Sequence, residues 1–257
     1  MKLIFDIGYN RGKFTKECFA TYPFCRVVAL EANRCLIDPD WSRTTEEGRA
    51  HWHADAGFMT DAFATLSHNK ATGDLTIVYG LGSASSDKPG VLYMCPTSPG
   101  ISTASDLWRG ASRFALGSAN INRLSNWNHA AAVPSVTLDE LISRYGSPDL
   151  IKIDVEGYEL ELLRGLTTKQ KTICFEWTEE LPEVLYQGVK HLQELGYNEF
   201  GIIGYFVEGQ YSETITHNEA GDPFLVEPDN YYAWEEIEID SVIDSSRRIN
   251  YGMLFAR

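Results

Sequence analysis

The sequence predicts an α/β fold built on a mostly parallel sheet. Apolar runs of strand length alternate with helical stretches, a rhythm typical of parallel strands joined by crossover helices. The first run ends in an acidic turn punctuated by glycines, where many α/β proteins bind a nucleotide. The expected elements are strands at Lys2–Ile7, Arg26–Glu31 and near Ala50–Ala54, with a helix at Lys13–Tyr22.

The turn after the first strand has the pattern DxGxxxG. Glycines lack a Cβ, so they allow positive φ angles and let the backbone approach a ligand closely. The helix that follows directs the N-terminal end of its dipole at this turn. Taken alone, the pattern is equally compatible with an ordinary turn between a strand and a helix. The residues expected to bind a cofactor here are Asp6, Gly8, Tyr9, Asn10 and Gly12.

A second acidic residue, Glu31, ends the second strand, where a carboxylate is placed to bind ribose hydroxyls. We expect Glu31 and its neighbours Ala32 and Asn33 to contact an adenosine-containing cofactor. The turn lacks the GxxxxGK[ST] pattern of a phosphate-binding loop, and Asp6 would repel a pyrophosphate. A cationic cofactor without phosphate, such as S-adenosylmethionine, fits this turn better.

Two further motifs carry a family resemblance. Val136–Leu141 reads VTLDEL and Asp149–Glu159 reads DLIKIDVEGYE. Together with the opening turn, they resemble the FkbM-like family of S-adenosylmethionine-dependent methyltransferases, over roughly residues 1–60 and 133–177. The resemblance implies a Rossmann-like class I methyltransferase fold: a mostly parallel seven-stranded sheet, an antiparallel last strand at Tyr251–Ala256, and helices on both faces. Relatives usually carry alanine at the position of Tyr9 and an aliphatic residue at that of Arg11.

The third strand has its own expected site residues. In relatives, the position after this strand lies beside the adenine, so we expect Asp55 and Ala56 to contact it, with Asp55 accepting from the adenine amino group. The alternative for Asp55 is an ordinary turn residue. His51 and His53 would share one face of the strand, where edge or core histidines are favoured and a metal pair is the alternative.

The resemblance favours a single methyltransferase domain over residues 1–257, with substrate-covering insertions near 58–133 and 206–246. Within the first insertion, Leu75–Tyr79 is interpreted as an extra strand. Gly80 and Gly82 form only a fragment of a dinucleotide-binding pattern and receive no role. The candidate lining groups of this insertion are Ser102, Thr103, Trp108, Arg109 and Trp127.

Catalysis is assigned to carboxylates at strand ends. Asp154 follows the strand Leu150–Ile153 and Glu176 follows Thr172–Phe175, two neighbouring strands in the family's strand order. A hydroxyl must lose its proton as it attacks a methyl group, so Asp154 is expected to act as the base, with Glu176 as its partner. Two close carboxylates can instead hold a divalent metal, Mg²⁺ or Mn²⁺, and this alternative stays open. Acceptor contacts are assigned to Glu156 and Trp177.

The predicted function is therefore S-adenosylmethionine-dependent O-methylation of a small molecule or glycan hydroxyl. The aromatic loops suit stacking on a sugar ring. One alternative is a catalytically silent module that binds an adenosine cofactor. Another is a NAD-dependent oxidoreductase, which the missing GxGxxG pattern disfavours.

The composition of the chain indicates which classes of partner and which cellular compartment to expect. The formal net charge of -14 argues against nucleic acids and membrane surfaces, which attract basic faces. The short apolar run at the N-terminus is broken by Asp6, so it predicts neither a signal peptide nor a membrane span and indicates a cytoplasmic protein. The five scattered cysteines lack zinc-site spacing and are expected to be reduced thiols. The oligomeric state stays open.

Overall fold

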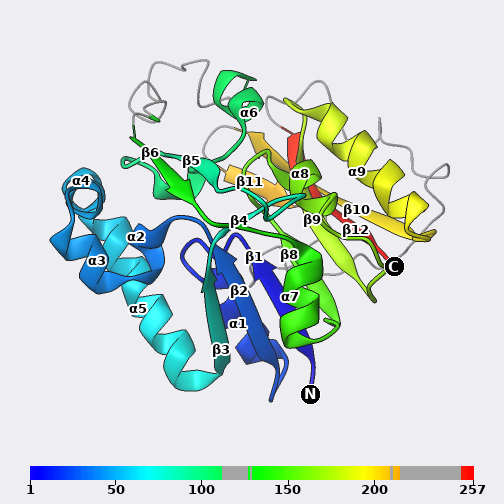
Figure 1. The fold of residues 1–257 in the computed structure, drawn as a ribbon, viewed down its shortest axis with the longest axis horizontal. Coiled ribbons are helices and arrows are strands. Elements are labelled where there is room, and N and C mark those ends of the chain that lie inside the picture. Colours follow the sequence, from blue (N-terminus) through cyan, green and yellow to red (C-terminus); the bar gives the residue numbers. More distant parts are fainter. Residues whose placement is uncertain (112–126, 128, 209–210, 215–249) are drawn as a thin grey trace.

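The structure, a computed structural model, describes residues 1–111, 127, 129–208, 211–214 and 250–257. Its main sheet has eight strands in the order β11-β10-β12-β9-β8-β1-β2-β3 (Figure 1). The strands from β9 to β3 run parallel, and β12 runs antiparallel between β9 and β10. The strands are β1 (Leu3–Ile7), β2 (Arg26–Glu31), β3 (Asp74–Tyr79), β8 (Leu150–Ile153), β9 (Ile173–Thr178), β10 (Phe200–Glu208), β11 (Tyr211–Thr214) and β12 (Asn250–Ala256).

This strand order is that of the class I methyltransferase fold. The mostly parallel seven-stranded sheet with an antiparallel last strand is therefore confirmed, and β11 adds an antiparallel edge strand. Most of the second expected insertion, near 206–246, falls outside the described residues.

Helices cover both faces of the sheet because strand side chains alternate between faces. Ile4 of β1 packs with Phe14 on the face covered by α1, whereas Phe5 packs with Leu141 and Leu162 on the face covered by α7, α8 and α9. The helices are α1 (Lys13–Thr21), α2 (Arg34–Ile37), α3 (Pro39–Thr44), α4 (Glu46–Ala54), α5 (Ala56–Thr72), α6 (Asp106–Ala111), α7 (Leu138–Tyr145), α8 (Glu159–Leu163) and α9 (Pro182–Glu194).

The strand expected near Ala50–Ala54 is wrong, because these residues belong to α4. The side chain of Thr45 accepts a hydrogen bond from the backbone N–H of Gly48 and caps this helix. A cap of this kind stabilises a helix by about 1 kcal/mol. His51 and His53 therefore lie on a helix, where Nδ1 of the buried His51 is 3.0 Å from the carbonyl oxygen of Glu47.

The third parallel strand is β3, which pairs with β2 along its whole length. The segment interpreted as an extra strand thus belongs to the main sheet. Residues 58–79 supply most of α5 and β3, so the insertion begins only after Tyr79.

The inserted segment forms two small sheets above the main one. In the first, β4 (Leu81–Gly82) pairs with β7 (Ser135–Val136), and in the second, β5 (Gly90–Met94) pairs with β6 (His129–Val133). Between β5 and β6 lie a 3₁₀ turn at Pro99–Ile101 and α6. Figure 1 shows this segment on the side of the sheet where β1 and β2 end.

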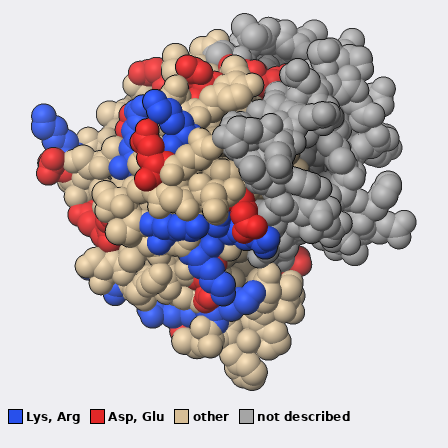
Figure 2. Space-filling model, turned by 90° about the vertical axis from the view of Figure 1, so that its right-hand side faces the viewer, with Lys and Arg blue, Asp and Glu red and all other residues tan. Residues whose placement is uncertain are grey.

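Charge is unevenly spread over the surface. Figure 2 shows Lys and Arg side chains gathered across the lower half of the described part of one face, with Asp and Glu among them. All five cysteines are buried free thiols. Within the described ranges, no helix has the length and apolar character needed to cross a membrane.

Candidate active site

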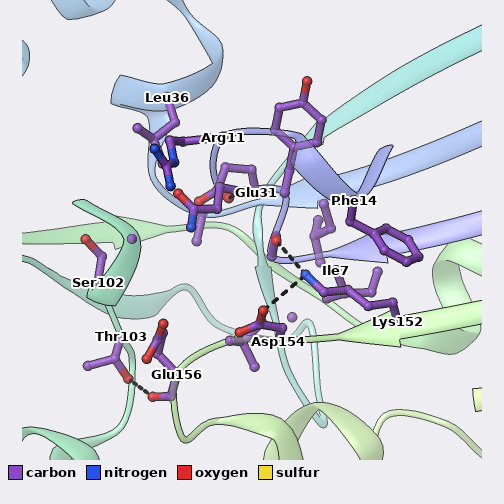
Figure 3. A pocket seen from close by; sticks show the side chains of 18 of the residues that line it. Ile7, Arg11, Phe14, Glu31, Leu36, Ser102, Thr103, Lys152, Asp154 and Glu156 are labelled. Carbon is purple, nitrogen blue, oxygen red and sulfur yellow. Dashed lines mark hydrogen bonds and ion pairs between the residues drawn. The ribbon is translucent and has the colours of Figure 1, made fainter. Parts of the chain in front are cut away.

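A cavity of about 680 Å³ opens at the carboxyl ends of β1, β2 and β8 (Figure 3). Ligands of open α/β sheets bind at this edge, and pockets of roughly 300–1,000 Å³ hold small molecules. The lining comes from the turn after β1, the end of β2, the start of α1, the inserted segment and the loop after β8. It includes Gly8, Tyr9, Asn10, Glu31, Ala32, Gly80, Leu81, Gly82, Ser102, Thr103, Lys152, Asp154, Glu156 and Glu176.

The turn after β1 has the backbone that its glycines predict. Gly8 has φ +84° and Gly12 has φ +71°, in the left-handed region that favours glycine. A Cβ on Gly8 would lie 1.8 Å from the carbonyl oxygen of Asp154, so the turn contacts the end of β8 backbone to backbone. Only glycine allows this approach.

The carboxylate of Glu31 accepts hydrogen bonds from two backbone N–H groups, one from the turn after β1 and one from the residues after β2. Its Oε2 accepts a hydrogen bond from the N–H of Asn10 (2.7 Å) and its Oε1 accepts one from the N–H of Asn33 (2.7 Å). Burial raises the pKa of Glu31, and these two hydrogen bonds oppose that rise because they favour the carboxylate. Each oxygen has a second lone pair that can accept a ligand hydroxyl.

Tyr9 braces the turn. Its side chain is buried, and its hydroxyl accepts a hydrogen bond from Nδ2 of Asn69 in α5 (3.1 Å). The same Asn69 nitrogen donates to the carbonyl oxygen of Gly12 (2.9 Å). Asn69 thus ties the turn after β1 to α5.

Asp6 does not line the cavity, contrary to expectation. It is fully buried beneath the turn, where Thr15 donates to its Oδ2 (2.6 Å) and Nζ of Lys152 lies 3.5 Å from its Oδ1. Burial raises the pKa of Asp6, and the ammonium of Lys152 opposes the rise. Gly12 and Asn33 also lie behind the wall, with Asn33 capping α2 through the N–H of Cys35.

Asp55 and Ala56 are also outside the cavity lining. Asp55 caps α5 by accepting from the N–H of Phe58 (2.8 Å), which is the turn role left open as its alternative. Because β3 is the third parallel strand, the segment that follows it, Gly80–Gly82, takes the place at the cavity that Asp55 was expected to fill.

The carboxylates of Asp154 and Glu156 lie on the opposite side of the cavity from Glu31 (Figure 3), and Glu176 forms a group of three with them. Asp154 follows β8 directly, Glu156 lies two residues later, and Glu176 comes from β9. One oxygen from each lies within 4.8 Å of the others, a spacing from which they could hold a metal ion. All three side chains are half-buried.

Two details of β9 differ from expectation. Glu176 lies inside the strand rather than after it, because pairing with β12 extends β9 to Thr178. Trp177 points away from the cavity, since neighbouring strand residues face opposite sides. It is 1% exposed and packs in the core under α9, which excludes the expected contact with an acceptor.

Lys152 connects the cofactor turn to the carboxylates. Its Nζ lies 3.4 Å from Oδ2 of Asp154 and 3.5 Å from Oδ1 of Asp6, and it donates to the carbonyl oxygen of Gly8 (3.1 Å). The two carboxylates keep this buried ammonium charged, because their attraction outweighs its desolvation and raises the pKa of Lys152. Lys152 is thus paired with two acids.

The sequence profile of the methyltransferase FkbM domain matches residues 6–201. The chain belongs to the FkbM methyltransferase family. No curated protein matches the sequence.

Among solved structures, this FkbM methyltransferase is similar to a precorrin-6y C5,15-methyltransferase from Geobacter metallireducens GS-15. The TM-score is 0.41 at 13% identity, covering 100% of this chain and 78% of that one. It is also similar to a putative methyltransferase from Thermoplasma acidophilum, with a TM-score of 0.37 at 8% identity, covering 99% and 67%.

FkbM membership implies S-adenosylmethionine as the cofactor, and the residues present fit it. Oδ1 of Asn10 is buried without a hydrogen-bond partner among the described residues, so it offers an acceptor to a bound polar group. Glu31 offers acceptors for ribose hydroxyls, and the carboxylates opposite suit a cationic sulfonium.

The inserted segment of this methyltransferase contributes part of its expected lining. Ser102 and Thr103 line the cavity, whereas Trp108 and Trp127 pack in a separate buried cluster, and the guanidinium of Arg109 lies 3.7 Å from the ring centre of Tyr93. Sequence reasoning missed the cavity residues Gly80, Leu81 and Gly82. Their signal was the β-rich run just before them.

Proposed function

We propose that this FkbM methyltransferase transfers the methyl group to a hydroxyl oxygen of a sugar or a similar small polyhydroxyl compound. The observation that carries the proposal is the convergence of Asp154, Glu156 and Glu176 in the cavity. A hydroxyl becomes a competent nucleophile as it loses its proton, and a carboxylate within hydrogen-bond reach accepts that proton.

The residues of the site then divide the work. S-adenosylmethionine supplies the electrophilic methyl group of its sulfonium when bound. Glu31 accepts from the ribose hydroxyls. Asp154, held in place by Lys152, accepts the proton of the acceptor hydroxyl. Glu176 and Glu156 accept hydrogen bonds from neighbouring hydroxyls, which a polyol offers and a phosphate or carboxylate does not.

The same carboxylates could work through Mg²⁺ or Mn²⁺. Asp154, Glu156 and Glu176 each offer an oxygen within 4.8 Å of the others, so these three carboxylates would hold the ion, and the ion would lower the pKa of a bound hydroxyl. Lys152 already places one positive charge 3.4 Å from Asp154, and this charge disfavours a second cation beside the same carboxylate. Direct proton acceptance by Asp154 is therefore the primary proposal. Removal of metal by EDTA distinguishes direct proton acceptance from a metal-assisted reaction.

The acceptor class can be tested with methyl-tritiated S-adenosylmethionine and a panel of neutral glycosides, their deoxy analogues and the matching sugar phosphates. We expect transfer to neutral glycosides, loss of transfer when the target hydroxyl is removed, and weak transfer to sugar phosphates. Nuclear magnetic resonance of the product should locate the methyl group on oxygen. A methyl group on carbon or nitrogen would refute the O-methylation proposal.

Calorimetry distinguishes the remaining classes of function. Heat on titration with S-adenosylhomocysteine, and none with NAD, is expected. Binding of S-adenosylhomocysteine without methyl transfer to any panel member or to a metabolite extract would instead indicate a silent binding module.

We further propose a cytoplasmic enzyme that acts on small molecules or glycans rather than on nucleic acids or membranes. Buried free cysteines suit a reducing compartment, and a net charge of -14 disfavours polyanions. Cosedimentation with anionic vesicles and mobility shift with DNA should both be negative at physiological salt. Binding in either assay would contradict this proposal.

A further inference from the structure

A buried carboxylate that does not touch the cavity shapes the loop that does. Glu159 begins α8 and is 2% exposed. Its Oε1 accepts hydrogen bonds from the backbone N–H of Val155 (3.0 Å) and from that of Gly157 (3.1 Å). These two amides flank Glu156, so a single oxygen holds the loop on both sides of a cavity residue.

The loop has a conformation that needs such support. Glu156 has φ +56° and Gly157 has φ +83°, two consecutive residues in the left-handed region. For a residue with a Cβ this region costs about 1–2 kcal/mol, which the surroundings must offset.

The inserted segment holds the same loop from the other side. Oγ1 of Thr103 donates to the carbonyl oxygen of Glu156 (2.7 Å), as Figure 3 shows. A Cβ on Gly157 would lie 2.8 Å from Cβ of Trp108, so the loop packs tightly against α6. With its amides and its carbonyl fixed, the loop directs the carboxylate of Glu156 toward Asp154 and Glu176.

We propose that Glu159 is a positioning residue, which holds Glu156 in the cavity by fixing the backbone on both sides of it. This inference rests on the proposed function for the role of Glu156 toward the acceptor. The geometric part stands by itself, because it concerns only how three carboxylates of the chain are brought together.

Two substitutions of Glu159 differ in whether they keep the oxygen that accepts both hydrogen bonds. Glu159→Gln retains Oε1 and its acceptor lone pairs, whereas Glu159→Met fills a similar volume and cannot accept. Glu161→Met is the matched control on the same helix, because the Glu161 side chain is 40% exposed and pairs only with Arg164 in the described hydrogen bonds.

Trivalent terbium reports the carboxylate cluster without any acceptor. Terbium binding is measured as tryptophan-sensitised luminescence during a titration. The component of the signal assigned to the cluster is the part of the wild-type luminescence that is lost in Glu156→Gln. Glu159→Met should weaken this component at least about tenfold, the loss expected when one charged ligand is displaced. Glu159→Gln and Glu161→Met should stay within about threefold of the wild type. The double variant Glu159→Met with Glu156→Gln should bind no more weakly than Glu156→Gln alone.

Several results would overturn the proposal. It fails if wild-type protein shows no component sensitive to Glu156→Gln, if Glu159→Met binds terbium like the wild type, or if Glu159→Gln is as damaged as Glu159→Met. S-adenosylhomocysteine affinity checks the fold, and an equal loss of it in both Glu159 variants would assign Glu159 to the whole site instead. Failure of O-methylation would leave the terbium pattern unchanged, so the two proposals fail separately.

Discussion

Oε2 of Glu31 accepts a 2.7 Å hydrogen bond from the backbone N–H of Asn10, which joins the end of β2 to the turn after β1. The carboxylate therefore has two duties. It fixes the shape of the turn, and each of its oxygens keeps a second lone pair, which we propose accepts a cofactor hydroxyl.

Removing this carboxylate should weaken cofactor binding. Glu31→Ala leaves the N–H groups of Asn10 and Asn33 unpaired and deletes the ribose acceptors, a loss of about 1–3 kcal/mol. S-adenosylhomocysteine affinity, measured by calorimetry, should fall tenfold or more. Glu199→Ala is the control, since its side chain is 51% exposed in a surface ion pair with Arg257. Equal affinities in wild type and Glu31→Ala would remove Glu31 from the cofactor site.

Asp154→Asn should separate catalysis from cofactor binding. The amide keeps the shape of the carboxylate and removes the base, so turnover should fall by at least about a hundredfold while S-adenosylhomocysteine affinity is retained. Asp74→Asn, at the opposite end of the sheet from the cavity and 59% exposed, should retain full turnover. Wild-type turnover in Asp154→Asn would leave this carboxylate only a structural role.

Chelation distinguishes direct proton acceptance by Asp154 from a reaction that uses a divalent metal ion. If Asp154 accepts the proton directly, EDTA leaves turnover of the wild-type enzyme unchanged. If the three carboxylates hold a metal, EDTA abolishes turnover, and Mg²⁺ or Mn²⁺ restores it. Initial rates before and after chelation, with each metal added back in turn, decide between them.

Lys152→Met should destabilise the protein far more than a matched surface change. It leaves the buried Asp6 without its ammonium partner, and breaking a buried pair in this way costs about 3–5 kcal/mol. Lys171→Met breaks a pair with Asp149 in which the lysine side chain is 69% exposed, and should cost about 1 kcal/mol or less. Urea unfolding at neutral pH gives both values, and similar losses in the two variants would show that Asp6 does not depend on Lys152.

Glu159 should make stability depend on pH. Burial raises the pKa of Glu159 from 4.5 to about 7, so the folded state holds a proton that the unfolded state has already released. Its contribution is complete below about pH 4.5 and is lost as pH rises through about 7. Relative to Glu159→Gln, the wild-type free energy of unfolding should therefore fall by roughly 3 kcal/mol between these limits. A constant difference across this range in urea unfolding would contradict the shift.

The sequence was most informative where a strand and its following turn formed one continuous pattern. The run ending in Asp6 and Gly8 predicted β1 and its turn, and the run ending in Asp154 predicted β8 with its bounds. Pairing in parallel sheets joins distant segments, so the convergence of Asp154 with Glu176 came from the family's strand order rather than from local pattern.

The errors have local physical causes. The segment around His51 was assigned to a strand, although Thr45 is followed by two acids, the start signal of a helix. Because of this error the third strand was expected about twenty residues too early, and Asp55 was expected at the cavity although it caps α5. Trp177 could have been excluded from sequence, because it neighbours Glu176 and strand residues alternate between faces. The burial of Asp6 beneath the turn could not have been predicted from sequence. Only the packing of α1 and β8 around the turn decides which of its residues face the cavity.

The contact between Gly8 and the carbonyl oxygen of Asp154 has a further consequence. Main chain touching main chain sets the separation between the turn after β1 and the backbone of Asp154. A change of the Asp154 rotamer moves its carboxylate but leaves this backbone separation unaltered. Substitutions in the inserted segment, which contributes Ser102 and Thr103 to the cavity lining, can therefore reshape the cavity while this backbone contact stays the same.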